Sequence, residues 1–139
     1  MRNVLLDAGP LIALFSPGDR HRRHYEDLMA DPASGGFRLL TTWPCIVEAS
    51  HLLDPPRNFE MLQWIQLRGA EVHPFDVSHL DEMLGWMRRY TEAGKREMDL
   101  ADASLYWLAG ETGILDVMTT DHNDFARYRL SDGRCFNIL

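Results

Sequence analysis

Apolar and polar residues form alternating blocks along the chain, and these blocks predict strands and helices in turn. The first block, residues 4–6, is apolar without polar alternation, which is typical of a strand buried on both faces of a parallel sheet. Asp7 ends this strand, and Gly9 and Pro10 then suit a sharp turn and the first turn of an apolar helix. We therefore expect Asp7 at the carboxyl end of a core strand, where open α/β sheets place their ligand sites.

Helical and extended patterns continue to alternate through the rest of the chain. Apolar residues at helical spacing predict helices over residues 20–29, 43–53, 59–67, 77–90 and 98–109, and a short one through 124–125. Further strands are predicted at residues 37–42, 70–75, 114–120 and 135–139. Because strands that alternate with helices pair in parallel, the pattern predicts one α/β domain over residues 1–139, a three-layer α/β/α sandwich around a mostly parallel sheet.

Composition and charge narrow the class of protein. The chain of 139 residues has two cysteines, Cys45 and Cys135, which we interpret as buried thiols in a reducing compartment. Asp7 interrupts the first apolar run, and no stretch is long enough to span a membrane, so we expect a cytoplasmic protein. The net charge of −7 argues against a broad basic surface for nucleic acid, but it allows a nuclease whose carboxylates are reserved for divalent cations.

Four aspartates form two pairs with the same spacing, Asp99-x-x-Asp102 and Asp121-x-x-Asp124, each at a predicted helix start. Any of them could be a helix cap or complement the positive end of the helix. Asp7 and Asp121 share a further property, since each directly follows a predicted core strand. If those strands are neighbours, the two carboxylates would face each other across one crevice, which is unfavourable unless a cation lies between them.

Asp102 and Glu48 add two acids in apolar surroundings. Asp102 lies in a helix that otherwise looks buried, and no lysine or arginine follows at helical spacing to neutralise it. Glu48 lies on another helix among apolar neighbours, where it could also be an ordinary solvated position. Together with Asp7 and Asp121, these acids suit hard cations such as Mg²⁺ or Mn²⁺. Thr120 is a candidate to orient a water or a phosphate beside them.

Other kinds of site find less support. His21 and His24 have no cysteine or third histidine near them in the sequence, so a zinc site is not predicted. The chain has no G-x-S-x-G, no G-x-x-x-x-G-K and no G-x-G-x-x-G motif, and Ser104 lacks an evident base.

Four segments resemble, in order, the four acidic motifs of PIN-domain ribonucleases. They are LDAGPLI at residues 6–12, TWPCIVEA at 42–49, LADASL at 100–105 and TTDHNDF at 119–125. The resemblance covers nearly the whole chain, and small single-domain members of this kind are mostly VapC-like toxins of bacterial toxin-antitoxin modules. It implies a parallel sheet flanked by helices, metal-dependent cleavage of RNA, a homodimer, and inhibition by an antitoxin whose tail enters the acidic site.

The resemblance also assigns roles to single residues. The four acids that match the family's catalytic and metal-binding positions are Asp7, Glu48, Asp102 and Asp121. Asp99 and Asp124 correspond to accessory metal-binding acids of some members. The serine or threonine that commonly follows the first aspartate is Ala8 here, which removes one hydroxyl from the expected site.

These observations lead to a hypothesis of phosphodiester hydrolysis assisted by one or two Mg²⁺ or Mn²⁺ ions. Asp7 and Asp102 would be the principal ligands, with Glu48 and Asp121 binding a metal directly or through water. Cations at the rim would attract RNA, unless they are ordinary solvated positions of helix faces, and the candidates are Arg20, Arg22, Arg23, Arg88, Arg89, Lys95 and Arg96.

Two alternatives remain at the level of sequence. One is a catalytically inactive PIN-like interaction module whose acidic crevice binds a basic partner segment. The other is a magnesium-dependent phosphatase, although Gly9 occupies the position at which such enzymes carry the second aspartate of a D-x-D pair.

Overall fold

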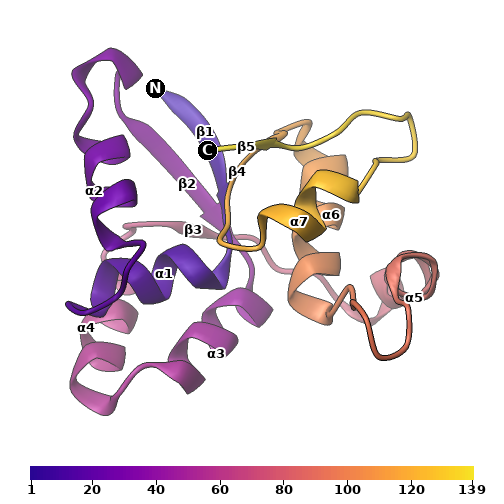
Figure 1. Cartoon of the computed structure of the whole chain (residues 1–139), viewed down its shortest axis with the longest axis horizontal. Coiled ribbons are helices and arrows are strands. Elements are labelled where there is room, and N and C mark those ends of the chain that lie inside the picture. The colour runs from indigo at the N-terminus through magenta and orange to yellow at the C-terminus, as the bar shows by residue number, and fades with distance from the viewer.

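The first strand of the chain, which the sequence predicted to be a buried core strand, is the middle strand of the sheet. The computed structural model describes residues 1–139, and it contains one five-stranded sheet in the order β3-β2-β1-β4-β5 (Figure 1). Every neighbouring pair is parallel, as the fold class requires. The strands are β1 (Arg2–Leu6), β2 (Phe37–Thr41), β3 (Glu71–Val72), β4 (Asp116–Met118) and β5 (Asn137–Ile138).

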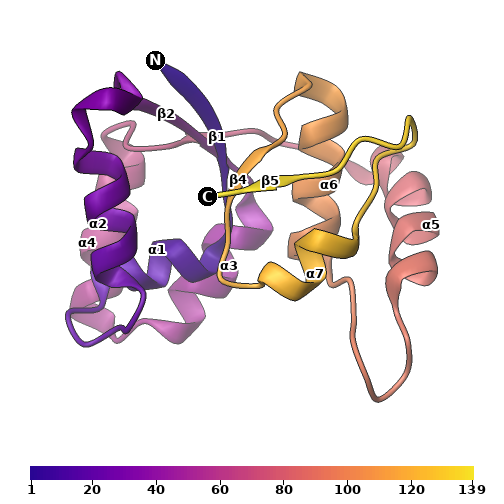
Figure 2. The same ribbon diagram turned by 45° about the horizontal axis from the view of Figure 1, so that its top comes forward.

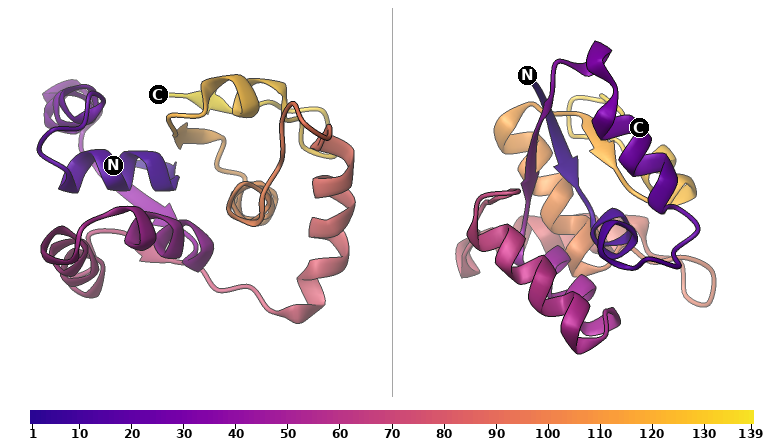
Figure 3. Two further views of the ribbon diagram at one scale, coloured as in Figure 1. Left: turned by 60° about the horizontal axis from the view of Figure 1, so that its bottom comes forward. Right: turned by 90° about the vertical axis from the view of Figure 1, so that its left-hand side faces the viewer.

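Seven α-helices cover the two faces of this sheet. They are α1 (Ala8–Phe15), α2 (Arg22–Ala30), α3 (Trp43–Leu52), α4 (Pro55–Gln66), α5 (Leu80–Tyr90), α6 (Leu100–Thr112) and α7 (His122–Arg127). Figures 1 and 2 show α1 to α4 gathered on one side of the strands and α5 to α7 on the other, and the left view of Figure 3 shows the same separation. The predicted three-layer α/β/α architecture is confirmed.

Alternate residues of β1 supply the two halves of the core. Val4 and Leu6 belong to the apolar cluster under α1 to α4, whereas Leu5 belongs to the cluster formed mainly by α5, α6 and α7. This alternation follows from the two-residue period of a strand. All three side chains are fully buried, which explains why the first strand shows no polar alternation in the sequence.

The register of β1 and β4 decides where the acidic residues lie. Leu6 pairs with Met118, and the Asp7 N–H donates to the Met118 carbonyl at 3.0 Å, so the ladder continues one residue beyond the strand. Both strands therefore end at the same edge of the sheet. Asp7 and the segment that leads to Asp121 leave this edge side by side, as the sequence predicted for neighbouring strands.

Several element boundaries differ from the predictions. The strand predicted over 70–75 is paired only at Glu71–Val72, and the strand predicted over 114–120 only at Asp116–Met118. Pro74 lacks the N–H that continued pairing would need. The helix predicted over 59–67 begins at Pro55, because Asp54 caps it by accepting the Arg57 N–H at 3.1 Å and proline suits the first helical turn.

Two expectations about single residues are wrong. Cys45 is buried as expected, but Cys135 is exposed. Gly9 makes no sharp turn, because it lies inside α1 without a positive φ. The glycine is needed for space, since a Cβ at this position would lie 2.2 Å from the Thr120 Oγ1.

None of the helices combines the length and the apolar character needed to cross a membrane.

Candidate metal centre

Three aspartates from three different elements meet at the carboxyl edge of the sheet. Asp7 follows β1, Asp102 lies in the first turn of α6, and Asp121 immediately precedes α7. One carboxylate oxygen from each lies within 4.8 Å of those of the other two. Asp7 and Asp102 are buried, with 3% and 5% of their surface exposed, whereas Asp121 is exposed to solvent. The site therefore has a buried floor and an open side.

Asp7 is held by donors on both of its oxygens. Its Oδ1 accepts the Ala8 N–H at 2.8 Å, so the residue caps α1, and its Oδ2 accepts the Thr119 hydroxyl at 2.7 Å. The same Thr119 oxygen accepts the Asp121 N–H at 3.0 Å. Thr119 thus connects the first and the fourth acidic motifs through one buried hydroxyl.

This role of Thr119 was missed at the sequence level, where Thr120 was the candidate. The two threonines follow β4 directly, and their side chains have different neighbours. The Thr119 hydroxyl donates to Asp7, and the Thr120 side chain lies against Gly9 instead. A signal was available in the register, because Thr119 follows β4 by one residue as Asp7 follows β1.

Asp102 is fixed differently, through a residue distant in the sequence. Its Oδ2 accepts the Tyr128 hydroxyl at 2.6 Å, and its own N–H donates to the Asp99 Oδ1 at 2.9 Å, which makes Asp99 the cap of α6. No lysine or arginine forms an ion pair with Asp7 or Asp102. Two buried carboxyl groups therefore rely on neutral donors alone.

Burial and mutual repulsion oppose ionisation of this cluster. Burial, only partly offset by the Thr119 and Ala8 donors, raises the pKa of Asp7 to about 6. Burial followed by the charge of Asp7 raises the pKa of Asp102 to about 9. The pKa of Asp121 is also raised, first by partial burial of its carboxyl beside the cluster, although the residue as a whole reaches solvent, and then by the charge of Asp124.

A divalent cation would remove this conflict of charge. Carboxylate oxygens are the ligands that Mg²⁺ and Mn²⁺ prefer. The positive charge of a bound ion would lower the pKa values of these acids and so favour their ionised forms. The donor set, its close spacing and its lack of a basic partner all fit such an ion.

Glu48 and Asp99 lie beside the three-aspartate cluster. They line one hollow of about 710 Å³ between α3 and the start of α6. The Glu48 side chain reaches solvent, yet partial burial of its carboxyl, followed by the charges of Asp99 and Asp7, raises its pKa to about 7. The charges of the cluster therefore affect the pKa of Glu48, although Glu48 is not one of the three acids that lie within 4.8 Å of one another.

Asp124 differs from the other acids because it has a basic partner. Its Oδ1 lies 3.3 Å from the Arg127 Nη2, and Arg127 is on the next turn of the same helix. The structure places Asp124 near Asp121 but outside the three-aspartate cluster. Its accessory role in metal binding stays a prediction.

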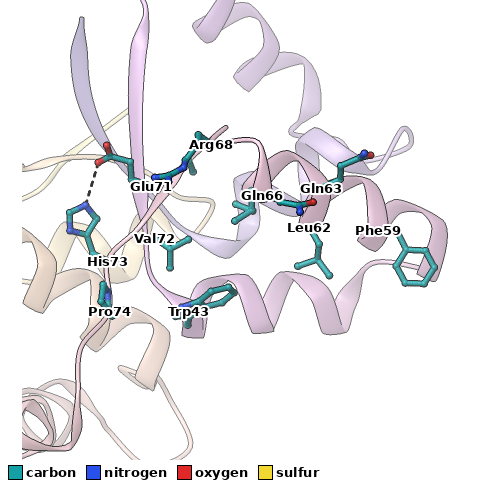
Figure 4. Close-up of a pocket in the computed structure, with 12 residues that line it drawn as sticks. Trp43, Phe59, Leu62, Gln63, Gln66, Arg68, Glu71, Val72, His73 and Pro74 are labelled. Carbon is teal, nitrogen blue, oxygen red and sulfur yellow. Dashed lines mark hydrogen bonds and ion pairs between the residues drawn. The ribbon is translucent and has the colours of Figure 1, made fainter.

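A larger hollow of about 1130 Å³ lies next to the one lined by Glu48 and Asp99, between α4 and the edge strand β3. Figure 4 shows Phe59 and Leu62 of α4, Trp43 at the start of α3, and Val72 of β3 around it. None of the candidate acids lines it. It shares Trp43 with the hollow that holds Glu48 and Asp99, so an apolar surface adjoins the acidic one.

Several of the predicted rim cations already face acids on the surface. Arg22 pairs with Glu26 at 2.6 Å and Arg96 with Glu92 at 3.7 Å, each one helical turn apart or across a short loop. Exposed pairs of this kind are weak and exchange readily with other partners. Attraction of RNA by these side chains stays a prediction.

Comparison with known proteins assigns a family and finds a structural relative. The chain matches the PIN domain family over residues 4–130. Among solved structures it is similar to the VapC20 toxin of Mycobacterium tuberculosis, described as a sarcin-ricin loop cleaving toxin, with a TM-score of 0.68 and 18% sequence identity over 87% of this chain and 92% of that one. No curated protein sequence matches. The match across nearly the whole chain, together with the parallel sheet and its acidic edge, shows that the protein belongs to the PIN-domain family.

Proposed function

We propose that this protein is a metal-dependent ribonuclease that hydrolyses RNA phosphodiester bonds as the toxin of a toxin-antitoxin pair. The observation that carries the proposal is the cluster of Asp7, Asp102 and Asp121, whose oxygens lie within 4.8 Å of one another without a basic partner. The family membership supports nuclease chemistry, and the fold shared with a toxin that cleaves the sarcin-ricin loop supports RNA as the substrate class.

The metal-binding role that we propose for each acid follows from its burial. Asp7 and Asp102 would be the principal ligands of a Mg²⁺ or Mn²⁺ ion, because both are buried and held in place by donors on fixed elements. Asp121 and Glu48, on the open side, would bind directly or through water. Asp99 and Asp124 would act as accessory acids.

When bound, such an ion lowers the pKa of a water molecule and stabilises negative charge on the phosphate. The protein itself then has three tasks. Asp7 and Asp102 hold a buried concentration of negative charge, Thr119 fixes Asp7 relative to the Asp121 backbone, and the exposed Asp121 and Glu48 leave one side open to the RNA backbone.

We also propose an antitoxin and a second copy of the chain as partners. The acidic site would accept a basic segment of the antitoxin, and the apolar surface around Trp43, with 53% of that side chain exposed, adjoins the site and could bury apolar residues of a partner. A homodimer is the expected assembly.

The proposal is tested by incubating the purified protein with total bacterial RNA in Mn²⁺ or Mg²⁺ and sequencing the new 5′ ends. We expect discrete cleavage that EDTA abolishes and that Asp7→Asn removes. Asp54→Asn, at the cap of α4 away from the site, is the matched control and should cleave like the wild type. Binding of a basic peptide without metal and without cleavage would favour the inactive interaction module instead.

A further inference from the structure

Tyr128 lies at the end of α7 and forms a contact that the acidic motifs do not include. Its hydroxyl donates to the Asp102 Oδ2 at 2.6 Å, across 26 positions of the sequence. The side chain is fully buried, so water does not compete for this hydrogen bond. The contact connects the end of α7 with the first turn of α6, so it joins the helix that follows Asp121 to the helix that contains Asp102.

The ring of Tyr128 is itself tightly confined. Phe125 and Tyr90 pack against it edge to face, with ring centroids at 5.2 and 5.1 Å, and the Arg127 guanidinium lies over the ring, 5.1 Å from its centroid. Aromatic pairs of this geometry and a cation over a ring both stabilise one orientation. The hydroxyl therefore has a fixed direction rather than a choice of partners.

The hydrogen bond occupies only one of the two oxygens of Asp102. Oδ2 accepts the Tyr128 hydroxyl, and Oδ1 accepts no hydrogen bond from the protein. A carboxylate that rotates freely presents either oxygen, whereas one held at Oδ2 presents Oδ1 consistently. A hydroxyl can do this without the positive charge of a lysine or arginine, which would compete with a metal ion for the acid.

We propose that Tyr128 is a positioning residue for the metal site, which holds Asp102 through Oδ2 and leaves Oδ1 as the oxygen that binds the ion. The inference rests on the proposed metal-binding role of the acidic cluster. Carboxylates that bind metals are themselves hydrogen-bonded as a rule, and loss of such a partner weakens metal affinity about 10- to 100-fold.

The first test compares Mn²⁺ binding by isothermal titration calorimetry in the wild type, Tyr128→Phe and Tyr106→Phe. Phenylalanine keeps the ring that packs against Phe125 and Tyr90 and removes only the hydroxyl. Tyr106→Phe is the matched control, since it removes a hydroxyl from another buried tyrosine of the same core, one that donates to the Arg129 carbonyl. We expect Mn²⁺ affinity at least about tenfold weaker in Tyr128→Phe and unchanged in Tyr106→Phe.

The second test uses the wild-type protein and so does not depend on the folding of a variant. With tyrosine labelled at ¹³Cζ, saturation with Mg²⁺ should shift the Tyr128 resonance, because its acceptor becomes a metal ligand, and should leave the Tyr106 resonance in place. An unmoved Tyr128 resonance in the Mg²⁺-saturated protein would overturn the inference.

The outcomes separate the two proposals. Wild-type protein that binds no Mn²⁺ would overturn the proposed metal site and this inference with it. Wild-type and Tyr128→Phe proteins that bind Mn²⁺ equally well would overturn the inference alone and leave the metal site standing.

Discussion

The same D-x-x-D spacing occurs at the starts of α6 and α7, and the two copies have opposite structures. In α6 the first acid, Asp99, caps the helix through the Asp102 N–H, and the second acid, Asp102, joins the buried cluster. In α7 the first acid, Asp121, makes no side-chain cap bond and joins the cluster, while the second, Asp124, pairs with Arg127. The same spacing of two aspartates therefore does not give the corresponding residues the same role.

The difference follows from where each helix begins relative to the sheet. Asp121 comes three residues after β4, so the strand itself delivers the first acid of α7 to the carboxyl edge. No strand directly precedes α6, and it is the second acid of its first turn, Asp102, that lies within 4.8 Å of Asp7. The basic partner completes the contrast, because α7 supplies Arg127 one turn after Asp124, and α6 contains no lysine or arginine.

The largest expected effect is on catalysis, and it distinguishes Asp102 from Asp124, the second acids of the two pairs. We expect Asp102→Asn to lower RNA cleavage roughly a hundredfold or more, because it removes a charged ligand from the site. Asp124→Asn should stay within a few-fold of the wild type, since Arg127 already neutralises this acid. The rates are measured at saturating Mn²⁺ on the RNA identified by end sequencing. Equal losses in both variants would show that the two pairs contribute alike.

A second effect concerns how the free energy of unfolding of the metal-free protein depends on pH. The folded-state pKa of Asp7, about 6, lies above its ordinary 3.8, so the native protein binds the proton more tightly than the unfolded chain does. The stabilisation is complete below about pH 4 and is lost as pH rises through 6, by roughly 3 kcal/mol for this shift, and Asp102 extends the loss toward pH 9.

Urea unfolding in EDTA between pH 5 and 9 measures this dependence. Asp7→Asn should flatten the profile between pH 5 and 6 and leave the loss due to Asp102 at higher pH, whereas Asp124→Asn should keep the slope of the wild type. A wild-type free energy of unfolding that rises over this range would mean that the buried acids find a compensating partner.

The smallest expected effect separates the two first acids, Asp99 and Asp121. Asp99→Ala removes a cap and should lower the free energy of unfolding by about 1 kcal/mol. Asp121→Ala removes no cap bond and should not destabilise the protein. Thermal unfolding at pH 5 in EDTA suits this comparison, because protonation of Asp102 there reduces the repulsion that either substitution would relieve. Equal destabilisation would assign a capping role to both.

Much of the fold followed from the sequence because the central strand is buried on both faces. Val4, Leu5 and Leu6 left an unbroken apolar run, and the alternation of strands and helices then required parallel pairing. The edge strands β3 and β5 were harder to bound, since each pairs over only two residues and backbone pairing of that length leaves little pattern in the side chains.

The acids of the site were predictable as candidates, but their partners were not. Asp7 and Asp121 follow strands, and Asp102 lies in an apolar helix, so each carries a local signal. Tyr128 reaches Asp102 only because α6 and α7 pack together, and a buried tyrosine among aromatic neighbours has no local feature that marks its hydroxyl. Which of Thr119 and Thr120 donates to Asp7 likewise depends on how β4 pairs with β1.

The most direct test of the account is thermal unfolding at pH 8 with and without Mn²⁺, in the wild type, Asp102→Asn and Asp124→Asn. At about one hundred times its dissociation constant, Mn²⁺ should stabilise the wild type by about 2.7 kcal/mol. Most of this stabilisation should remain in Asp124→Asn, whose acid is at most accessory, and it should disappear in Asp102→Asn. A wild type that Mn²⁺ leaves unchanged, or an Asp102→Asn variant that it stabilises equally, would contradict the assignment of a metal centre to the buried aspartates.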